Sequence, residues 1–402
     1  MPQVRPDRSD VDDGRCGLIA REPTEPGPMR IGTPREIKNH EYRVGLTPES
    51  AGELAAHGHE VLVESGAGEG IGARDEDYAA VGARVVDTAA EVFERAEMIV
   101  KVKEPQAVER AMLREGQILY TYLHLAPDPE QTADLVASGA TCIAYETVTD
   151  ARGGLPLLKP MSQVAGRLSV QAGATALEKS HGGRGVLLGG VPGVAPASVL
   201  VIGGGVVGFN AAQMAVGLGA DVTVLDRDPD VLERIATHFG PSVRTRFANR
   251  SNLAETVAAA DLVVGAVLVP GAAAPKLVTR AALATMKPGA VLVDVAIDQG
   301  GCFETSRATT HQDPTFTVDG IVHYCVANMP GAVARTSTYA LNNVTLPHAI
   351  RIADLGWRGA LGANPHLAAG LNVHAGRITC APVAEALGRE AASVGEVLAK
   401  AA

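Results

Sequence analysis

Long apolar runs, paired cysteines and an excess of positive charge are all missing from this chain of 402 residues. Without an apolar run of about 20 residues, no membrane-spanning helix is expected. The five cysteines are widely spaced and form no C-x-x-C pair, which argues against a zinc site and a disulfide framework and favours a reducing, cytoplasmic setting. A net charge of −10 disfavours nucleic acid as a partner, because such binding depends on clustered Lys and Arg.

What the chain does contain is a globular composition, with 46 % hydrophobic and 20 % charged residues. Its length is enough for two domains, each with a core of its own. The first 28 residues are polar, rich in Pro and Asp, and lack an apolar core, so they are predicted to be a disordered extension rather than a secretory signal. Folded structure is expected to begin at Met29, which is also a candidate start of translation.

From Met29 onward, short apolar segments with strand character alternate with segments of helical character. The predicted strands of the first half lie within 29–36, 60–67, 97–105 and 141–148, and the predicted helices within 47–59, 88–96 and 128–139. Thr47 is a plausible N-cap for the first of these helices, with Pro48 at its first position. This alternation predicts parallel sheets covered by helices, and therefore an α/β fold.

A second α/β series follows a long helical segment at 161–183 and a glycine-rich loop. After residue 334 the composition becomes helical again. We therefore expect two Rossmann-like domains with a cleft between them, the first of which is discontinuous. The expected boundaries are 29–156 with 335–402 for the substrate domain, and 157–334 for the dinucleotide-binding domain.

The strongest single motif is "SVLVIGGGVVG", in which Gly203, Gly205 and Gly208 fit the pattern G-x-G-x-x-G between a strand and a helix. The first glycine permits a tight turn, the second lets the backbone approach a pyrophosphate, and the third allows close packing of helix on strand. The next predicted strand ends in Asp226, at the distance expected for a carboxylate that binds ribose hydroxyls. Asp226 favours NAD over NADP, although the neighbouring Arg227 could pair with a 2′-phosphate.

His124 raises a separate question, because it stands in the apolar and aromatic run "ILYTYLHLA". Taken alone, it is more easily interpreted as a core histidine with satisfied nitrogens than as a group that transfers protons. Its pKa range nevertheless makes histidine the usual acid or base near neutral pH. The remaining histidines, among them His311, His348 and His374, show no metal-ligand spacing, and no metal is expected.

Several long segments resemble the family of alanine dehydrogenases, which also includes the NAD-binding subunit of proton-translocating transhydrogenases. The resemblance runs from about Met29 to the C-terminus. It is carried by "PREIKNHEYRVGLTP", "KVKEP", "LHLAPD", "PMSQVAGRLSVQAGA", "GGVPGVAPASVLVIGGGVVG", "VGAVLVPGAAAPKLV", "VDVAIDQGGCFE" and "YCVANMPGAVARTSTYAL". It implies reversible oxidative deamination of L-alanine to pyruvate and ammonium with NAD, and assembly into a homohexamer.

The resemblance also implies which residues bind the substrate. Arg43 would supply a planar guanidinium fork for the substrate carboxylate. Lys101 and Lys103 both lie in the predicted strand at 97–105, on one face if the strand is regular, and spacing alone does not choose between them. The family motif assigns Lys103 to the carboxylate or carbonyl oxygen of pyruvate. Asn328, in "CVANMPG", could fix a carbonyl group or a water.

For the chemistry itself, the resemblance places proton transfer on His124 and water activation on Asp298. Asp298 is expected at the end of the strand in "AVLVDVAIDQGG", in the region where doubly wound sheets bind ligands. Asp294, in the same segment, is the competing carboxylate and could be a structural hydrogen-bond acceptor.

Expected cofactor contacts are a hydroxyl on the long helix and residues at strand ends of the second domain, in addition to the three glycines and Asp226. They are Ser162, Val267, Leu268, Val295, Asp298 and Asn328. Where the family often has a Ser-Ser pair, this chain has Ala248 and Asn249, so that contact is left unassigned.

The sequence therefore predicts a cytoplasmic, NAD-dependent alanine dehydrogenase that acts on L-alanine, pyruvate and ammonium. The alternatives are the NAD-binding subunit of a transhydrogenase, a catalytically silent NAD-binding regulator, and a related opine or lysine-pathway dehydrogenase. The joint presence of Arg43, Lys103, His124 and Asp298 disfavours the first two. The third would need room for a longer side chain.

Overall fold

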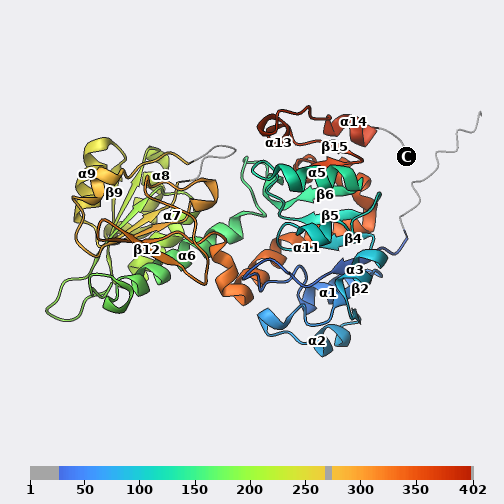
Figure 1. Ribbon diagram of the computed structural model, residues 1–402, viewed down its shortest axis with the longest axis horizontal. Helices are drawn as coiled ribbons and strands as arrows, with labels where there is room; N and C mark the ends of the chain where they lie inside the picture. Colours follow the sequence, from blue (N-terminus) through green and yellow to red (C-terminus); the bar gives the residue numbers. More distant parts are fainter. Residues whose placement is uncertain (1–26, 268–273, 400–402) are drawn as a thin grey trace, which may run out of the picture.

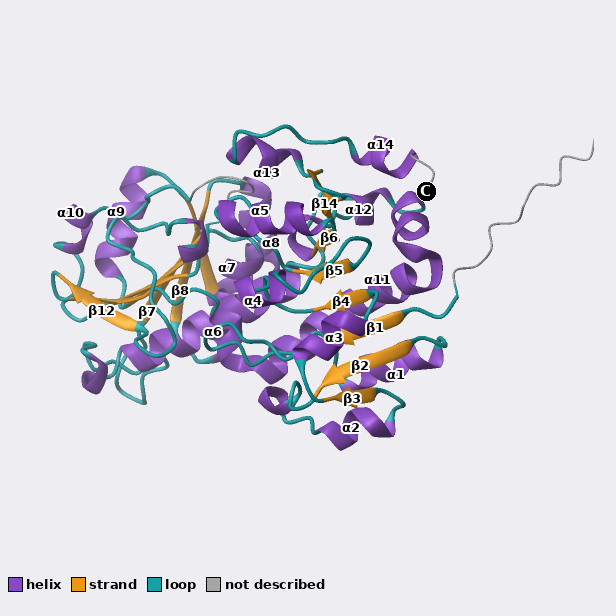
Figure 2. Ribbon diagram, turned by 45° about the vertical axis from the view of Figure 1, so that its right-hand side comes forward, coloured by secondary structure: helices purple, strands orange, loops and turns teal. Residues whose placement is uncertain are grey.

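The computed structural model describes residues 27–267 and 274–399, and within them the chain forms two sheets with helices around each. Figure 1 shows the two sheets in two units that lie side by side, and Figure 2 shows the helices that flank their strands. The expected α/β class is confirmed. The expected disordered extension falls, except for its last two residues, outside the described part of the chain, as does Leu268.

The first sheet has eight strands in the order β15-β14-β6-β5-β4-β1-β2-β3. Strands β1 to β6 pair in parallel, whereas β14 and β15 are antiparallel additions from the C-terminal part of the chain. The strands are β1 Arg30–Thr33, β2 Glu60–Glu64, β3 Arg84–Val86, β4 Met98–Val100, β5 Ile118–Thr121, β6 Thr141–Ala144, β14 Leu371–His374 and β15 Arg377–Ile378.

The second sheet has seven strands in the order β12-β13-β11-β10-β7-β8-β9, and all its pairs are parallel except that of β12 with β13. Counted from β7 and without the antiparallel β12, its parallel strands have the order 3-2-1-4-5-6 of a doubly wound fold, and strands β1 to β6 of the first sheet have the same order. The strands are β7 Ser198–Ile202, β8 Asp221–Asp226, β9 Val243–Phe247, β10 Leu262–Gly265, β11 Val291–Asp294, β12 Thr315–Val318 and β13 Ile321–Tyr324.

The helices divide between the two units, and two long ones connect them. Around the first sheet lie α1 Pro48–Ala56, α2 Asp75–Ala80, α3 Ala89–Arg95, α4 Ala107–Arg110, α5 Pro129–Ser138, α12 Pro365–Ala368, α13 Ala381–Ala386 and α14 Val394–Ala399. Around the second lie α7 Val206–Gly217, α8 Pro229–Phe239, α9 Arg250–Ala259 and α10 Arg280–Leu283. The connecting helices are α6 Lys159–Ala176 and α11 Ala334–Gly362, which pack against each other.

The central strands of both sheets are buried on both faces, because alternate residues enter different apolar clusters. In β4, Met98 and Val100 belong to one apolar cluster and Ile99 to another, which is the two-residue period of a strand. Helix α6 contributes Met161 to the core of the first unit and Leu168 to that of the second. The two cores are therefore joined through this helix rather than through a free linker.

Two local expectations are wrong. The strand expected at 97–105 ends at Val100, so Lys101 and Lys103 lie beyond it rather than on one strand face. The C-terminal segment is not purely helical, because β14 and β15 extend the first sheet. As for helices, none in the described ranges has the length and apolar character needed to cross a bilayer.

Candidate active site

Two glycines of the motif, Gly203 and Gly205, lie in the turn between β7 and α7, and the third, Gly208, lies in the first turn of α7. Gly203 has φ of +98°, and a Cβ there would lie 2.7 Å from the carbonyl oxygen of Ala266. A Cβ on Gly208 would overlap the carbonyl oxygen of Gly203. Around Gly205, in contrast, no heavy atom lies within 4 Å of the Cβ position. The loop is thus sterically closed on the protein side and open in front of the N-terminus of α7, where an anion would be stabilised.

Asp226 stands beside this loop at the end of β8. Its Oδ2 accepts a hydrogen bond of 2.6 Å from the amide of Gly204, and its Oδ1 accepts one of 2.9 Å from the amide of Asp228. Arg234 on α8 donates to the carbonyl oxygen of Gly204 at 2.9 Å. The carboxylate is therefore held next to the glycine turn, while Arg227 is exposed.

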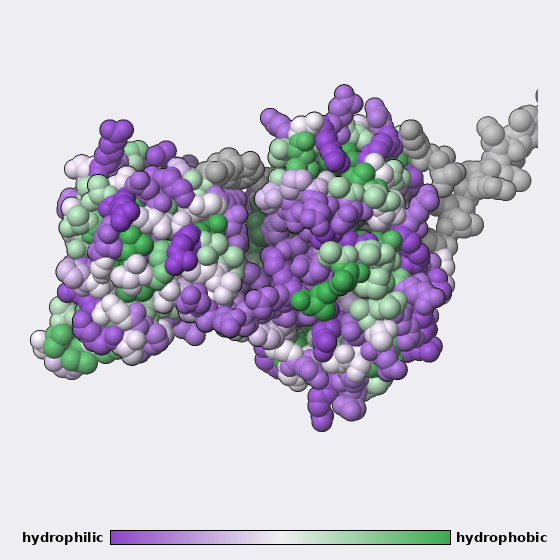
Figure 3. Space-filling model, in the orientation of Figure 1, coloured by the Kyte–Doolittle hydropathy of each residue, from purple (hydrophilic) through white to green (hydrophobic). Residues whose placement is uncertain are grey.

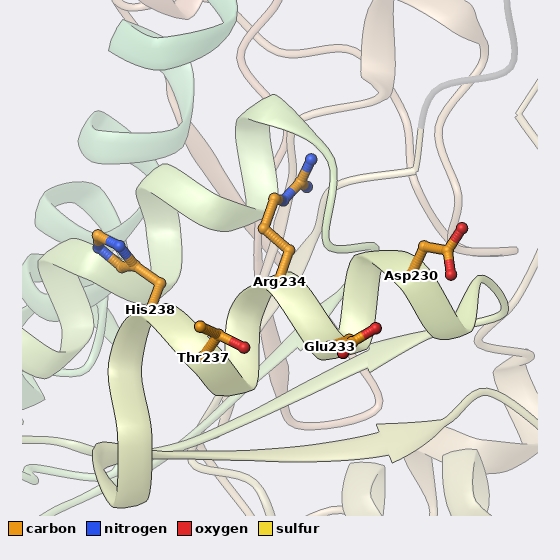
Figure 4. Close-up of a pocket in the computed structure, with 5 residues that line it drawn as sticks. All are labelled: Asp230, Glu233, Arg234, Thr237 and His238. Carbon is orange, nitrogen blue, oxygen red and sulfur yellow. The ribbon is translucent and has the colours of Figure 1, made fainter.

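A surface hollow runs along α8, and Figure 4 shows that all its lining side chains come from this one helix. They are Asp230, Glu233, Arg234, Thr237 and His238. None of them is a site residue predicted from the sequence. The hollow adds to the candidate site only through Arg234, which reaches the glycine turn.

Residues at the neighbouring strand ends lie close to the glycine turn. Val267 follows β10, and its Cγ2 would lie 3.2 Å from a Cβ on Gly203. Val295 follows β11, and its amide donates to the carbonyl oxygen of Gly265 at 3.0 Å. The structure thus brings these two predicted contacts to the carboxyl edge of the second sheet, at the point where the strand order reverses between β7 and β10.

The two aspartates after β11 have different surroundings. Strand β11 ends at Asp294, which is fully buried and accepts hydrogen bonds from the amide of Cys302 at 2.9 Å and the hydroxyl of Ser306 at 2.5 Å. We expected Asp298 to end this strand, but it lies beyond it in the short helix η5 Ile297–Gln299. Its side chain is exposed and makes no hydrogen bond or ion pair to the described residues. Asp294 is the structural acceptor of the pair.

Arg43 lies in the loop between β1 and α1, and its guanidinium is already engaged. Its Nε and Nη2 donate to Oε1 and Oε2 of Glu41 at 2.7 and 2.5 Å, and Nη2 also donates to Oδ1 of Asn328 at 2.7 Å. Burial alone would favour the neutral acid, but Arg43 and Asn328 outweigh it and lower the pKa of Glu41 to about 2. The expected free fork is therefore absent here, because Glu41 occupies one edge of it.

The two candidate lysines differ in how far their charge is already balanced. Lys101 is fully buried and its Nζ donates to Glu36 at 2.9 Å and to Glu109 at 2.6 Å. Lys103 has one ion-pair partner among the described residues, Glu104, at 3.5 Å. Lys101 is thus the structural member of the pair, and Lys103 is the ammonium better able to meet a further anion.

His124 is exposed, and its backbone is held in an unusual conformation. It lies three residues beyond β5 with φ of +50°, in the left-handed region that non-glycine residues rarely adopt. Oε1 of Glu146 accepts from its amide at 2.6 Å and from that of Leu123 at 3.2 Å. The imidazole stacks on the ring of Tyr122, with centroids 5.7 Å apart and planes at 7°. His124 is therefore not a buried core histidine.

The order of the parallel strands places Arg43, Lys103 and His124 at one edge of the first sheet, because they follow the neighbouring strands β1, β4 and β5. The hydroxyl of Thr121, at the end of β5, donates to the carbonyl oxygen of Lys103 at 3.0 Å. Burial by itself would raise the pKa of Glu104, but Lys103, Lys38 and His124 lower it. Tyr122, on which His124 stacks, contributes to raising the pKa of Arg43. That pKa is raised chiefly because the effect of Glu41 outweighs that of burial. Arg43, Lys103 and His124 consequently belong to one neighbourhood on the carboxyl edge of the first sheet.

Asn328 connects this neighbourhood to the second unit. It follows β13, has φ of +62° and precedes the short helix η6 Met329–Val333. Its amide contacts both Glu41 and Arg43, which lie in the first unit. Ser162 lies in the first turn of α6 and is half-buried, with no side-chain hydrogen bond to the described residues. No hydrogen bond or ion pair within the described ranges joins Asp298 to His124.

Sequence reasoning missed the carboxylates that hold the candidate residues. Glu41 could have been suspected from the pattern "EYR", which places it two residues before Arg43. Glu146 gives no such signal, because it lies 22 residues after His124 and meets it only when β5 and β6 pair.

Comparisons with known proteins cover nearly the whole described chain. Sequence models described as "Alanine dehydrogenase/PNT, N-terminal domain" and "Alanine dehydrogenase/PNT, C-terminal domain" match residues 32–165 and 169–381. This chain belongs to the alanine dehydrogenase/PNT family. A curated relative from Halomonas elongata named "Alanine dehydrogenase" is 62 % identical over 362 residues, which is 90 % of this chain and 98 % of that protein.

Solved structures place the chain nearer one branch of the alanine dehydrogenase/PNT family than another. A structure described as L-alanine dehydrogenase is 51 % identical and has a TM-score of 0.87, covering 90 % of this chain and 99 % of its own. A transhydrogenase from Sinorhizobium meliloti is 28 % identical and has a TM-score of 0.73, covering 87 % and 98 %. The expected membership of this family is confirmed.

Proposed function

We propose that the chain is an NAD-dependent alanine dehydrogenase that interconverts L-alanine with pyruvate and ammonium. A single observation carries the proposal: the chain is 62 % identical to an alanine dehydrogenase across 98 % of that protein. Support from the chain itself comes from Arg43, Lys103 and His124, which lie in one neighbourhood of the first sheet. The alternative hypothesis of a transhydrogenase subunit has less support, because the chain is 28 % identical in sequence to the transhydrogenase structure.

The residues of the second unit fit a bound dinucleotide. The open space around Gly205 and the start of α7 suit a pyrophosphate, and Asp226 at the end of β8 suits the hydroxyls of a ribose. Val267 and Val295, at the strand ends, would flank the cofactor, and Ser162, Leu268, Asp298 and Asn328 are further proposed contacts. When bound, NAD would supply the acceptor for the hydride that leaves Cα of L-alanine.

Substrate binding is proposed for the first unit, with residues 29–156 and 335–402 as the substrate domain and 157–334 as the dinucleotide domain. Among the described residues, Nη1 of Arg43 donates to the sulfur of Met161 alone, at 3.1 Å, and it is the nitrogen with capacity for a substrate carboxylate. Lys103 would provide a second positive charge for the carboxylate or carbonyl oxygen. Together the two cations would favour negative charge on the substrate oxygens.

Proton transfer is proposed for His124. After the hydride leaves Cα, the resulting iminium carbon is attacked by water, and His124 would take the proton that the water loses. The same imidazole would return that proton to nitrogen and then take up the hydroxyl proton as the C–N bond breaks, so that the carbinolamine collapses to pyruvate and ammonia. Asp298 would orient the water and stabilise the cationic intermediate. An exposed imidazole on a backbone fixed by Glu146 suits this shuttle.

We also propose a homohexamer in a cytoplasmic setting. Support for self-association comes from the loop between α6 and β7, where Leu187, Val191 and Val194 are 67, 53 and 62 % exposed. Figure 3 shows an apolar tip on the second unit, at the place where Figure 1 draws this loop. Light scattering of the purified chain gives the mass, and a monomer would contradict this assembly. The widely spaced cysteines are the support for a reducing compartment.

The activity is tested by following NADH formation by the purified protein. L-alanine should give the highest kcat/KM, compared with L-serine, glycine and L-lysine, and NADP should support far less turnover than NAD. Higher activity with L-lysine would favour the lysine-pathway alternative. Binding of NAD without turnover of any amino acid would favour the silent regulator.

His124→Ala tests the proton shuttle. We expect kcat to fall by about 10²–10⁴-fold, which is the typical contribution of general acid–base catalysis, while the dissociation constant for NADH stays within threefold. His374→Ala is a control for loss of an imidazole from the same unit. A kcat near that of the wild type in the His124 variant would contradict the assignment.

A further inference from the structure

The carboxylate of Glu41 has no capacity left for a proton or a ligand. Its side chain is fully buried and accepts four hydrogen bonds: three from Arg43, through the backbone amide at 3.0 Å, Nε at 2.7 Å and Nη2 at 2.5 Å, and one from Nδ2 of Asn328 at 2.9 Å. A carboxylate has about four acceptor sites, and all are used. Glu41 can therefore contribute to a reaction only by holding other groups.

The same contacts decide which nitrogen of Arg43 remains available. Of its donors, Nε is taken by Glu41, and Nη2 is shared between Glu41 and Oδ1 of Asn328. Nη1 faces only the thioether sulfur of Met161, which is a weak acceptor. A guanidinium that is 98 % buried thus retains one nitrogen without a strong acceptor among the described residues.

Glu41 also fixes the amide of Asn328, which comes from the second unit. Arginine only donates and a carboxylate only accepts, so the two contacts orient the amide with Oδ1 toward Arg43 and Nδ2 toward Glu41. Gly331 packs against this amide, since a Cβ there would lie 2.8 Å from Nδ2. His311 holds the carbonyl oxygen of Asn328 at 3.0 Å. The side chains of Glu41, Arg43 and Asn328 therefore form one fixed arrangement across the two units.

We propose that Glu41 is a positioning residue that holds Arg43 and Asn328 together across the two units and leaves Nη1 as the single guanidinium nitrogen for the substrate carboxylate. This rests on the proposed function, because it assigns a geometry to the same substrate site. Glu41 itself touches neither substrate nor cofactor. Its effect is on carboxylate affinity rather than on the chemical step.

Glu41→Gln is the sharpest variant, because it keeps the shape of the side chain. The oxygen of the glutamine amide can still accept a hydrogen bond from Arg43. Its NH₂ group, however, faces Nη2 of Arg43 and Nδ2 of Asn328, which both donate to the carboxylate in the wild type. Glu69→Gln is the matched control, since Glu69 lines the same surface hollow as Glu41 and Arg43 but is exposed and contacts neither. Each variant is measured in the amination direction by NADH consumption with pyruvate and ammonium.

We expect the KM for pyruvate to rise at least tenfold in Glu41→Gln, with kcat within threefold of the wild type and the dissociation constant for NADH within threefold. Glu69→Gln should match the wild type. In an Arg43→Lys background, which itself raises KM, Glu41→Gln should add less than twofold, because its effect passes through the guanidinium.

Three results would overturn the proposal: an unchanged KM, independent multiplication of the two effects, or a parallel fall of kcat, NADH affinity and melting temperature. Measurements on the wild-type protein distinguish a failure of the positioning role from a failure of the proposed function. An active wild type with an unaffected Glu41→Gln variant rejects only the positioning role. A wild type that neither turns over L-alanine nor binds pyruvate in calorimetry rejects both.

Discussion

The carboxyl edges of the two sheets have the same strand order but are built from opposite materials. At the second edge, glycines determine the path of the backbone, because other parts of the backbone approach closely where a side chain would otherwise lie. At the first edge, charged side chains are buried together with partners of opposite charge, as in the pair Arg43–Glu41 and in the group of Lys101 with Glu36 and Glu109. One topology thus presents bare backbone in one unit and balanced buried charge in the other.

This difference has a physical consequence for substitution. A side chain added at Gly203 or Gly208 disrupts the glycine turn, because the neighbouring backbone cannot move away cheaply. A buried ion pair fails when one partner is removed, because the remaining charge has lost its compensation. The second edge should therefore be sensitive to steric additions, and the first edge to deletions of charge.

The largest expected effect is that of Gly208→Ala. The new methyl group would overlap the carbonyl oxygen of Gly203, so α7 must move away from β7. We expect NADH binding to become undetectable by fluorescence titration and the free energy of unfolding to fall by about 3 kcal/mol. Gly217→Ala, at the other end of α7, is the control, because its Cβ meets nothing within 4 Å. Normal NADH binding by the Gly208 variant would show that the turn tolerates a side chain.

The next effect in size separates the two lysines of the first edge. Lys101→Met leaves Glu36 and Glu109 buried without their cation, and should lower the free energy of unfolding by about 3–5 kcal/mol in urea at pH 7. Lys103→Met should cost less stability than Lys101→Met, because Glu104 keeps its ion pair with Lys38, and should instead raise the KM for pyruvate. Equal stability of the two variants would mean that the charge of Lys101 is not structurally required.

The contrast between the two edges also explains how much the sequence could predict. The α/β class, the turn at Gly203 and the position of Asp226 at the end of β8 were predictable, because steric limits on glycine and strand periodicity act over a few residues. The cap at Thr47 was predictable for the same reason, and its hydroxyl accepts from the amide of Ser50.

The partners of the charged residues were not predictable from local pattern. Lys101 and Lys103 are two residues apart in similar surroundings, and only the fold brings Glu36 to Lys101, from 65 residues away. Asn328 reaches Arg43 across 285 residues. The antiparallel strands β14 and β15 were missed because their pairing partner, β6, lies more than 200 residues earlier. The resemblance to a family selected Lys103, but it did not indicate that the guanidinium of Arg43 is hydrogen-bonded to Glu41.

The smallest effect concerns Asp226, the carboxylate next to the glycine turn of the second edge. Asp226→Asn keeps Oδ1 as an acceptor for the amide of Asp228 but removes the negative charge beside Gly204. We expect NAD to bind about tenfold more weakly, which corresponds to about 1.4 kcal/mol, and discrimination against NADP to fall, because a neutral amide no longer repels a 2′-phosphate. Asp228→Asn, on the cap of α8, is the control for a neutralised carboxylate nearby. Kinetic constants for both cofactors check this, and an unchanged preference in Asp226→Asn would mean that the ribose is recognised by other residues, with Arg234 next to the same turn as the first to examine.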